Sequence, residues 1–266
     1  MTNLSSAGAE AKSTVSADPS RALSLTRHGE IAVIRIDRPA KRNAITLAML
    51  AQLRALLTEA VAEGASGIVL TGSADLFSAG FDLSELGQGQ ADSLVDDEIA
   101  LTALAIQGAT VPVIAAIEGA CIGAAVELVL SCDVRVASTQ AFFSVPAVKL
   151  GILYRPDAIA KMVGLLGRET AMRLLVLAER ISGPDLVGSG FVSRCVEPGT
   201  AFVTAIGLAE AGSDSIAGAV AATKALIIAA STPTIDLAEF EQIRLDLLGS
   251  TERTDAVAKA QGRPRA

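Results

Sequence analysis

Glu127 stands in a segment whose other residues are almost all small or apolar. The segment reads GACIGAAVELVLSCD, residues 119–133, and its pattern predicts a helix over residues 123–130. The first N–H groups of a helix have no intrahelical partner, and Ala124 and Glu127, three positions apart, share one face. A polarised carbonyl held at the Ala124 N–H would have a carboxylate beside it, and burial would raise the pKa of Glu127 and suit it to proton transfer. The alternative is structural: the carboxylate pairs with an arginine or caps a neighbouring element.

A second candidate backbone donor lies in TGSADLFSAGFDLSEL, residues 71–86. Asp82 and Glu85 fit a capping box, with Asp82 as the N-cap of a helix and Glu85 at its third position. The N–H of Phe81 would then lie just before a helix start, where it could face a ligand; the alternative is a glycine-containing turn with a good cap. With the Ala124 N–H it could form an oxyanion hole, in which each donor typically stabilises a transition state by about 3–4 kcal/mol.

The elements that must position these residues follow from the periodicity of the sequence. Alternating residues around a His-Gly turn predict a β-hairpin over 23–39, and apolar residues at helical spacing predict a helix over 46–64. A recurring ββα unit favours an α/β fold, with further strands expected over 67–72, 111–119 and 132–139. From about Asp157 the pattern becomes helical, with helices expected over 157–179, 202–213, 215–231 and 237–250.

Composition excludes several classes of protein. Hydrophobic residues make up 51% and mean hydropathy is +0.49, so a membrane span has to be considered. The longest apolar stretch, residues 111–130, is broken by Pro112, Glu118 and Glu127, and a charge at mid-span is costly in lipid. We therefore expect buried elements of a soluble protein and no membrane span. The net charge of −7 argues against a nucleic-acid partner, because phosphate binding needs a basic face.

Cysteine and histidine usage narrows the chemistry further. The three cysteines are far apart and in apolar contexts, which is typical of reduced thiols in a cytoplasmic protein. His28 is the only histidine, so no metal site is expected, and a Ser-His-Asp triad would depend on His28 alone. No G-x-S-x-G motif supports a serine hydrolase. Residues 1–20 have no apolar core of a signal peptide and are expected to form a disordered tail.

Three segments resemble successive signatures of one known family. RIDRPAKRNAI (35–45), TGSADLFSAGFDL (71–83) and GACIGAAVELVLSCDVRVAS (119–138) resemble, in order and spacing, those of the crotonase superfamily, the enoyl-CoA hydratase/isomerase family. The resemblance runs from about Leu23 to about Val196. It implies an α/β fold, a crotonase-like spiral of ββα units over residues 21–200, and a C-terminal helical region over residues 201–266. That helical region would form homotrimers or, as a dimer of trimers, hexamers.

The resemblance also implies a ligand and a site. The substrate would be an acyl-CoA thioester, with coenzyme A entering as part of the substrate and no cofactor bound permanently. The thioester oxygen would lie between the N–H groups of Phe81 and Ala124, and Glu127 would be the catalytic acid or base. The expected contacts to coenzyme A come from Lys41 and Arg42, near its phosphates and adenine, and from Ala44, Ala79, Asp82, Leu83 and Gly123. Solvated surface charge is the alternative for the two cations.

The sequence departs from the family pattern at the position of its second catalytic glutamate. In FFSVPAVKLGILYRPDA that position is Ala147, and GILYRPDA replaces the usual GxxPGxGG run. Ala124 also replaces the usual glycine of the first site. Hydration of a double bond needs both a base for water and an acid for the α-carbon, and losing one typically costs roughly 10²–10⁴-fold in rate. Hydratase activity is therefore expected to be weak or absent.

Two functions are compatible with the sequence. The first is an enzyme of the hydratase/isomerase type acting on an acyl-CoA, and the second is a family member that binds acyl-CoA without turnover. Tyr154, the only tyrosine, could replace the missing proton donor or could be a structural residue in an altered loop. Lys149 and Asp157 are expected to be surface residues.

Overall fold

The computed structural model describes residues 22–87, 93–231 and 237–261, so the tail expected over residues 1–20 lies outside the described chain. Within these residues, the larger sheet is antiparallel only between its first two strands, which form the expected hairpin; its other neighbours are parallel. Its strands, in spatial order, are β1 (Leu23–His28), β2 (Ile31–Ile36), β3 (Gly67–Thr71), β5 (Val113–Ile117), β7 (Val134–Ser138) and β10 (Arg194–Val196).

A second, smaller sheet is built from very short strands. In spatial order these are β4 (Leu76–Ser78), β6 (Ala120–Ile122), β8 (Phe142–Ser144) and β9 (Ile181–Ser182). Strands β4, β6 and β8 each follow a strand of the larger sheet, and each is followed in turn by an α-helix. The chain therefore repeats a ββα unit and places the first and second strands of successive units in two different sheets, which confirms the predicted crotonase-like α/β fold.

The α-helices pack against the two sheets and against one another, and short 3₁₀ helices lie in the connections. The helices are α1 (Leu47–Ala62), α2 (Ser93–Gly108), α3 (Ala124–Leu130), α4 (Pro156–Leu175) and α5 (Ala201–Glu210), with 3₁₀ helices η1 (Pro39–Lys41), η2 (Leu83–Glu85), η4 (Pro146–Leu150) and η5 (Pro184–Leu186). Helix α2 was not predicted, although its buried Val95, Ile99 and Ile106 have helical spacing.

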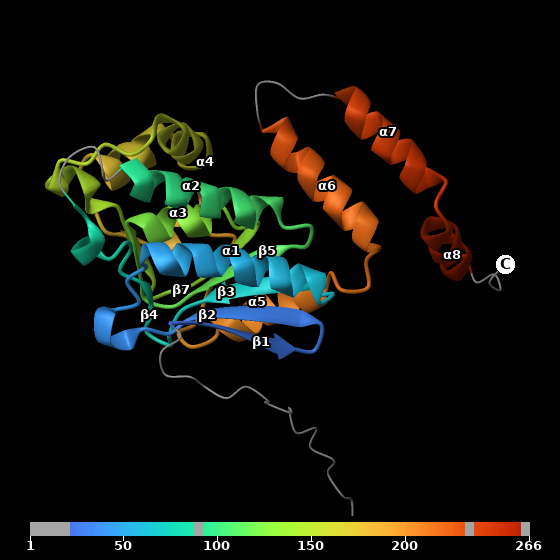
Figure 1. Ribbon diagram of the computed structural model, residues 1–266, viewed down its shortest axis with the longest axis horizontal. Helices are drawn as coiled ribbons and strands as arrows, with labels where there is room; N and C mark the ends of the chain where they lie inside the picture. Colours follow the sequence, from blue (N-terminus) through green and yellow to red (C-terminus); the bar gives the residue numbers. More distant parts are fainter. Residues whose placement is uncertain (1–21, 88–92, 232–236, 262–266) are drawn as a thin grey trace, which may run out of the picture.

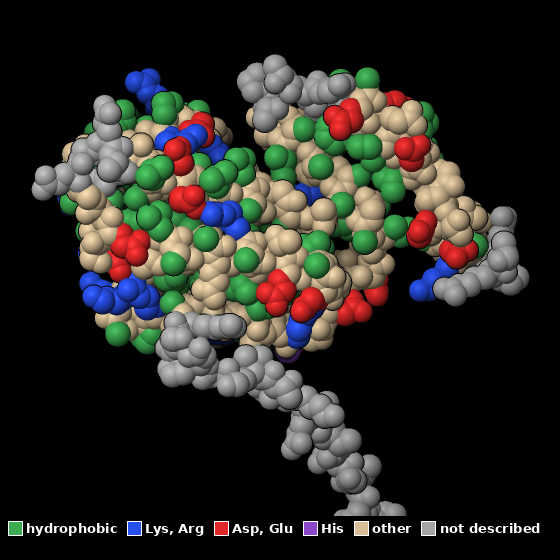
Figure 2. All heavy atoms as spheres, viewed as in Figure 1, with side chains coloured by type: hydrophobic (Ala, Val, Ile, Leu, Met, Phe, Trp, Pro, Cys, Tyr) green, Lys and Arg blue, Asp and Glu red, His purple; other side chains and the backbone are tan. Residues whose placement is uncertain are grey.

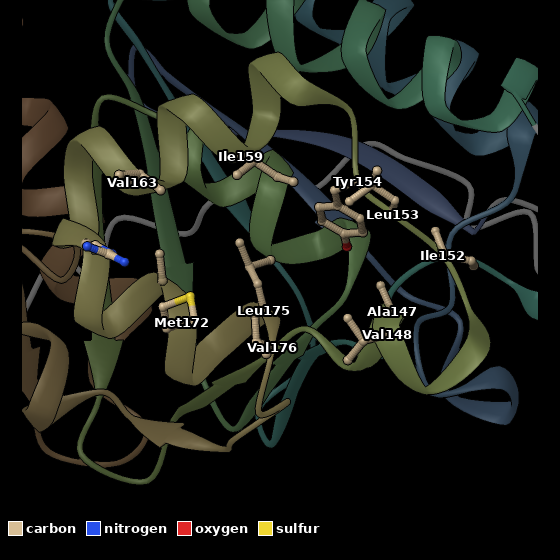
Figure 3. Close-up of a pocket in the computed structure, with 12 residues that line it drawn as sticks. Ala147, Val148, Ile152, Leu153, Tyr154, Ile159, Val163, Met172, Leu175 and Val176 are labelled. Carbon is tan, nitrogen blue, oxygen red and sulfur yellow. The ribbon is translucent and has the colours of Figure 1, made fainter.

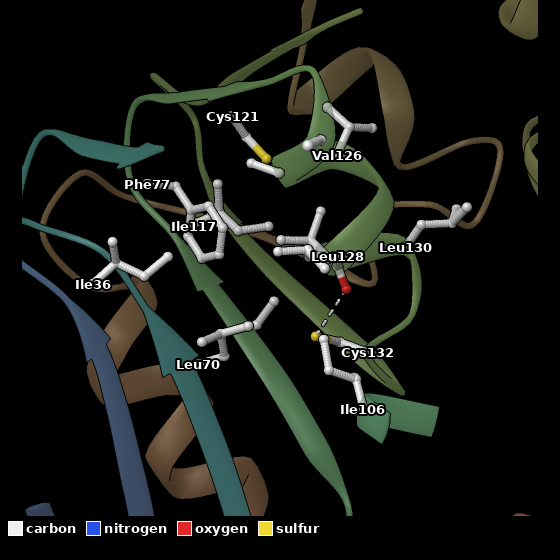
Figure 4. Packing of buried hydrophobic residues seen from close by; sticks show 14 of the residues in the cluster. Ile36, Leu70, Phe77, Ile106, Ile117, Cys121, Val126, Leu128, Leu130 and Cys132 are labelled. Atoms are coloured by element: carbon white, nitrogen blue, oxygen red, sulfur yellow. Dashed lines mark hydrogen bonds between the residues drawn. The ribbon is translucent and has the colours of Figure 1, made fainter. Parts of the chain in front are cut away.

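Successive residues along the strands of the larger sheet point alternately into two separate hydrophobic cores. Along β2, Ala32 and Ile34 face α1 and the smaller sheet, whereas Ile31 and Val33 face the opposite side. That opposite side is closed by α5, whose small buried residues include Ala205, and Figure 1 shows α5 alone on this face. With aromatic residues at only 3%, the main core is mostly aliphatic, and it packs α3 directly against β3 and β5 (Figure 4).

The last three helices, α6 (Ala217–Ala230), α7 (Leu237–Leu248) and α8 (Thr251–Ala260), extend away from the sheets (Figure 1). No residue of these three helices is buried, and hydrophobic side chains gather on α6 and α7 at the surface (Figure 2). Lys224 ties α6 to the core, because its Nζ lies 2.8 Å from Asp133 Oδ2 and donates to the Val111 carbonyl at 3.0 Å. In the described part of the chain, no helix is both long and apolar enough to span a membrane.

Candidate active site

The segment after β4 is held in place by the segment that follows the hairpin. The Ile45 N–H donates to the Gly80 carbonyl at 2.8 Å, and the Asp82 N–H donates to the Ile45 carbonyl at 2.8 Å. Asn43, fully buried, adds side-chain hydrogen bonds to the carbonyls of β4 at 3.1–3.2 Å. Two stretches of the first family signatures, residues 38–46 and 78–83, are thereby fixed side by side.

The second arm of the site is the tight turn between β6 and α3. Gly123 has φ 57° and ψ −126°, a conformation that favours glycine, and its N–H donates to the Ser144 carbonyl at 2.8 Å. Gly80 lies directly against this turn: a Cβ on Gly80 would approach the Ile122 oxygen to 2.5 Å and the Ala124 nitrogen to 3.4 Å. Only a glycine at position 80 lets the two backbones come this close.

This close approach brings together the two predicted backbone donors, because Phe81 follows Gly80 and Ala124 follows Gly123. Neither the Phe81 N–H nor the Ala124 N–H donates a hydrogen bond to any other part of the described chain. An N–H without a partner costs free energy when it is kept from water. Two unsatisfied donors from separate segments can therefore bind a single oxygen atom placed between them.

Glu127 lies on α3, three residues after Ala124, and its carboxylate takes part in none of the ion pairs or side-chain hydrogen bonds of the described chain. Burial raises its pKa from an ordinary 4.5 to about 7; the positive charge of Lys161 opposes this rise and the negative charge of Asp157 adds to it. Lys161 itself donates to the Ser131 hydroxyl at 3.0 Å. A half-buried carboxyl with a pKa near neutrality can both accept and return a proton.

The predicted capping box is half right: Asp82 is an N-cap, but Glu85 does not reach back to it. The structure has only the three-residue 3₁₀ helix η2 after Asp82, whose carboxylate accepts from the Ser84 N–H at 3.1 Å and the Ser84 hydroxyl at 2.6 Å. It also pairs with Arg38 at 2.6 Å, and these contacts hold the pKa of Asp82 well below its ordinary value. Glu85 accepts from the Leu47 N–H at the start of α1 instead of reaching back to Asp82. The Phe81 N–H therefore lies just before the start of η2, as predicted, and the hydrogen bonds of Ile45 to Gly80 and Asp82 fix the backbone on either side of it.

The residues predicted to contact coenzyme A lie on the two fixed stretches, with different exposure. Lys41, Arg42 and Leu83 are exposed, Ala44, Ala79 and Gly123 are half-buried, and Asp82 is buried with its carboxylate engaged. Arg42 and Ala79 line a hollow of about 700 Å³ that also includes Arg180. Lys41, Ala44 and Leu83 are not part of that lining, so the structure does not gather all seven residues in one cavity.

A second cavity lies where the family's second glutamate would stand. Ala147 lines it together with Tyr154 and side chains of α4, and its volume is about 170 Å³ (Figure 3). Apart from Tyr154 and Arg168, every lining side chain is apolar. Lys149 and Asp157 are exposed, as expected. The role of this cavity was not predicted; the sequence signal for it is the run of apolar residues at helical spacing along α4.

Comparison with known proteins agrees with this fold. The sequence model of the enoyl-CoA hydratase/isomerase family matches residues 26–263, so the chain belongs to this family, within the crotonase superfamily. It is 33% identical over 184 residues to the mevalonyl-coenzyme A hydratase sidH of Aspergillus fumigatus, covering 68% of each chain. It is 31% identical over 172 residues to the 2,3-dehydroadipyl-CoA hydratase of Escherichia coli, covering 64% of this chain and 68% of that protein.

Solved structures are similar over nearly the whole chain. Pseudomonas aeruginosa DspI superposes with a TM-score of 0.85 at 27% identity, covering 96% of this chain and 99% of that one. The human enoyl coenzyme A hydratase domain-containing protein 3 superposes with a TM-score of 0.81 at 26% identity, covering 92% of this chain and all of that one. The C-terminal helices therefore belong to the shared fold.

Proposed function

We propose that this protein acts on an acyl-CoA thioester, with the thioester oxygen accepting hydrogen bonds from the N–H groups of Phe81 and Ala124. The observation that carries the proposal is the pair of unsatisfied donors at the contact between Gly80 and the α3 turn. Such a pair stabilises the negative charge that develops on the oxygen when a thioester becomes enolate-like. Coenzyme A is bound as part of the substrate, along residues 41–44 and 79–83.

Glu127 is the catalytic acid or base of the proposed reaction. It lies on the same face of α3 as Ala124, and its pKa of about 7 suits a group that must give and take a proton at neutral pH. In the hydration of a 2-enoyl-CoA, its carboxylate takes a proton from the water that adds to C3. The second proton, at C2, has no carboxylic acid to supply it, because Ala147 occupies that position. Hydration is therefore slow.

A second candidate function is binding of acyl-CoA without turnover. The apolar lining around Ala147 favours it, since a cavity of this kind holds an acyl chain well and offers few groups for water activation. Both functions share the backbone donors. The relatives act, by their names, on mevalonyl-CoA and 2,3-dehydroadipyl-CoA, and a coenzyme A thioester is the part common to both.

We also propose a homo-oligomer, a trimer or a dimer of trimers, that covers the C-terminal helices. Helices α6 to α8 bury no residue in the single chain, and Ile227 and Leu237 remain 63% and 66% exposed. Apolar side chains in such numbers on one face are typical of an interface. A cytoplasmic location is a further prediction, resting on the unpaired cysteines.

The experiment that tests the proposed function combines binding and turnover. Dissociation constants for saturated acyl-CoA thioesters and hydration rates for 2-enoyl-CoA thioesters of several chain lengths are measured for the wild type and for Glu127→Gln. Glu98→Gln is the matched control, because Glu98 is a half-buried helical glutamate that pairs with Arg54 at 2.6 Å and lines neither cavity described above.

We expect the wild type and both variants to bind acyl-CoA. Hydration should be slow in the wild type and in Glu98→Gln, and absent in Glu127→Gln. Binding without any turnover would favour the second candidate function. A wild type that does not bind acyl-CoA would contradict both functions.

A further inference from the structure

We propose that Tyr154 is a second catalytic residue, whose hydroxyl protonates the α-carbon of the substrate in place of the carboxylic acid missing at Ala147. This inference rests on the proposed function and adds a residue to it. Tyr154 precedes α4, in a segment where the sequence departs from the family pattern.

The hydroxyl lies at the oxyanion-hole end of the cavity. A Cβ on Gly123 would have two neighbours within about 4 Å: the Gly80 Cα and the Tyr154 hydroxyl oxygen, each at 4.0 Å. The open space beside Gly123 is therefore bounded on one side by the segment that carries the Phe81 N–H and on the other by the phenol. For a thioester held by the two N–H groups, we place the α-carbon on the side of Tyr154.

The same hydroxyl faces the position of the missing acid. Tyr154 and Ala147 line one cavity, and Figure 3 shows the phenolic oxygen directed into the space between Leu175 and Ala147. Arg168, the other polar residue of the lining, is an exposed residue of α4. Within the described lining, the phenol is thus the one uncharged O–H group that could reach a substrate from this side.

The hydroxyl is available for a ligand. The Tyr154 hydroxyl makes no hydrogen bond within the described chain. Every fully buried side-chain oxygen or nitrogen of the described residues has a hydrogen-bond partner. The Tyr154 hydroxyl has none, so it must be accessible from the cavity. Tyr154 is half-buried, and a tyrosine in such a place with only a structural role usually has a hydrogen-bond partner for its hydroxyl. Here the natural partner is a substrate atom or a water molecule in the cavity.

The backbone around Tyr154 is held firmly enough to position the phenol. The Ile152 N–H donates to the Ala147 carbonyl at 3.0 Å, which closes the turn after η4. On the other side, Arg155 pairs with Asp97 of α2 at 2.6 Å and with Asp157 at 3.1 Å. Tyr154 thus stands between two anchored residues.

The proposed step balances in protons and charge. Glu127 takes a proton from water, the hydroxide bonds to C3, and the C2=C3 electron pair forms an enolate whose oxygen is held by the two N–H groups. The enolate C2 then bonds to the proton of the Tyr154 hydroxyl, whose O–H bond breaks to leave a phenolate. The protonated Glu127 returns its proton to that phenolate, directly or through water. The net reaction adds one water across the double bond and restores both side chains.

The protonation state of Tyr154 agrees with this role and with a slow reaction. Burial raises the pKa of Tyr154 above its ordinary value, and the negative charge of Glu127 raises it further. The phenol therefore keeps its proton throughout the physiological range. It is also a weaker acid than the carboxylic acid that it replaces, which agrees with hydration that is slower than in a site with two carboxylates.

The test compares wild type, Tyr154→Phe, Ala147→Glu and the double variant Ala147→Glu/Tyr154→Phe. Phenylalanine keeps the ring that packs in the cavity and removes only the hydroxyl. Hydration of crotonyl-CoA and longer 2-enoyl-CoA thioesters is followed by loss of enoyl absorbance, the dissociation constant of a saturated acyl-CoA is measured by calorimetry, and thermal unfolding checks the fold.

We expect Tyr154→Phe to lower kcat roughly 10²–10⁴-fold, with an unchanged melting temperature and a dissociation constant within about twofold of wild type. The double variant Ala147→Glu/Tyr154→Phe should recover turnover relative to Tyr154→Phe, because a carboxylic acid again reaches C2. A Tyr154→Phe variant that hydrates at the wild-type rate, or a double variant that stays inactive while Ala147→Glu alone is active, would overturn this inference and leave the proposed function standing. A wild type that binds acyl-CoA but hydrates none of the thioesters would overturn this inference and leave the second candidate function, binding without turnover.

Discussion

The raised pKa of Glu127 makes the stability of the protein depend on pH in a way that can be measured without any substrate. Its pKa is about 7 in the folded chain against an ordinary 4.5. At about 1.36 kcal/mol for each pH unit, this difference corresponds to roughly 3 kcal/mol. Because the folded pKa is the higher one, the folded state binds the proton more tightly. This contribution to stability is fully present below about pH 4.5 and is lost as the pH rises through about 7.

The perturbation is Glu127→Gln, which keeps the shape and removes the titration. Between about pH 5 and about pH 8.5, the wild type should lose roughly 2–3 kcal/mol of unfolding free energy more than the variant. The assay is urea unfolding of both proteins at several pH values and one fixed protein concentration. Other titrating groups contribute equally to both proteins, so the difference between them reports on Glu127. Equal pH dependence of the two proteins, or a wild type that gains stability relative to the variant as the pH rises, would refute the assignment of a buried, uncompensated carboxyl.

Three further predictions concern the backbone and the C-terminal helices. Ala124→Pro removes the N–H at the first position of α3, where proline is tolerated, and should lower kcat about 10²–10³-fold; Ala217→Pro, the same change at the exposed start of α6, should leave the rate unchanged. Gly80→Ala forces a side chain into a backbone with φ 93° and should lower the unfolding free energy by about 1–3 kcal/mol, measured in urea. Lys224→Met leaves Asp133 unpaired and should lower it by about 1–3 kcal/mol, seen as a lower melting temperature.

The longer elements could be predicted from the sequence because their patterns are local. The β1–β2 hairpin and α1 follow from alternation and from helical spacing over many residues, and both lie within a few residues of the predicted bounds. Strands β4, β6 and β8 have three residues each, which is too short for a periodic signal. They exist because the chain pairs them with one another, an interaction between residues far apart in sequence.

The candidate site, too, could be predicted only where its sequence signals are local. The positions of Phe81, Ala124 and Glu127 came from small residues and a carboxylate at short spacing, together with the family resemblance. The capping box is only half formed, because Glu85 accepts from the Leu47 N–H at the distant start of α1 while Asp82 still caps η2. A local motif cannot reveal such competition.

Tyr154 could be named as a candidate from the sequence but not assigned. Its ring reaches the site only because the turn after η4 and the ion pairs of Arg155 direct the chain toward Gly123. Cavity position, hydroxyl availability and distance to the α3 turn are properties of the folded chain alone.

The central claim is that the N–H groups of Phe81 and Ala124 bind one thioester oxygen beside Glu127. The most direct measurement is a crystal structure of the Glu127→Gln variant with a bound acyl-CoA. We predict the thioester oxygen within about 2.7–3.1 Å of both backbone nitrogens, with the side chain at position 127 facing the acyl chain. An oxygen bound elsewhere, or one that reaches only one of the two nitrogens, would contradict the account.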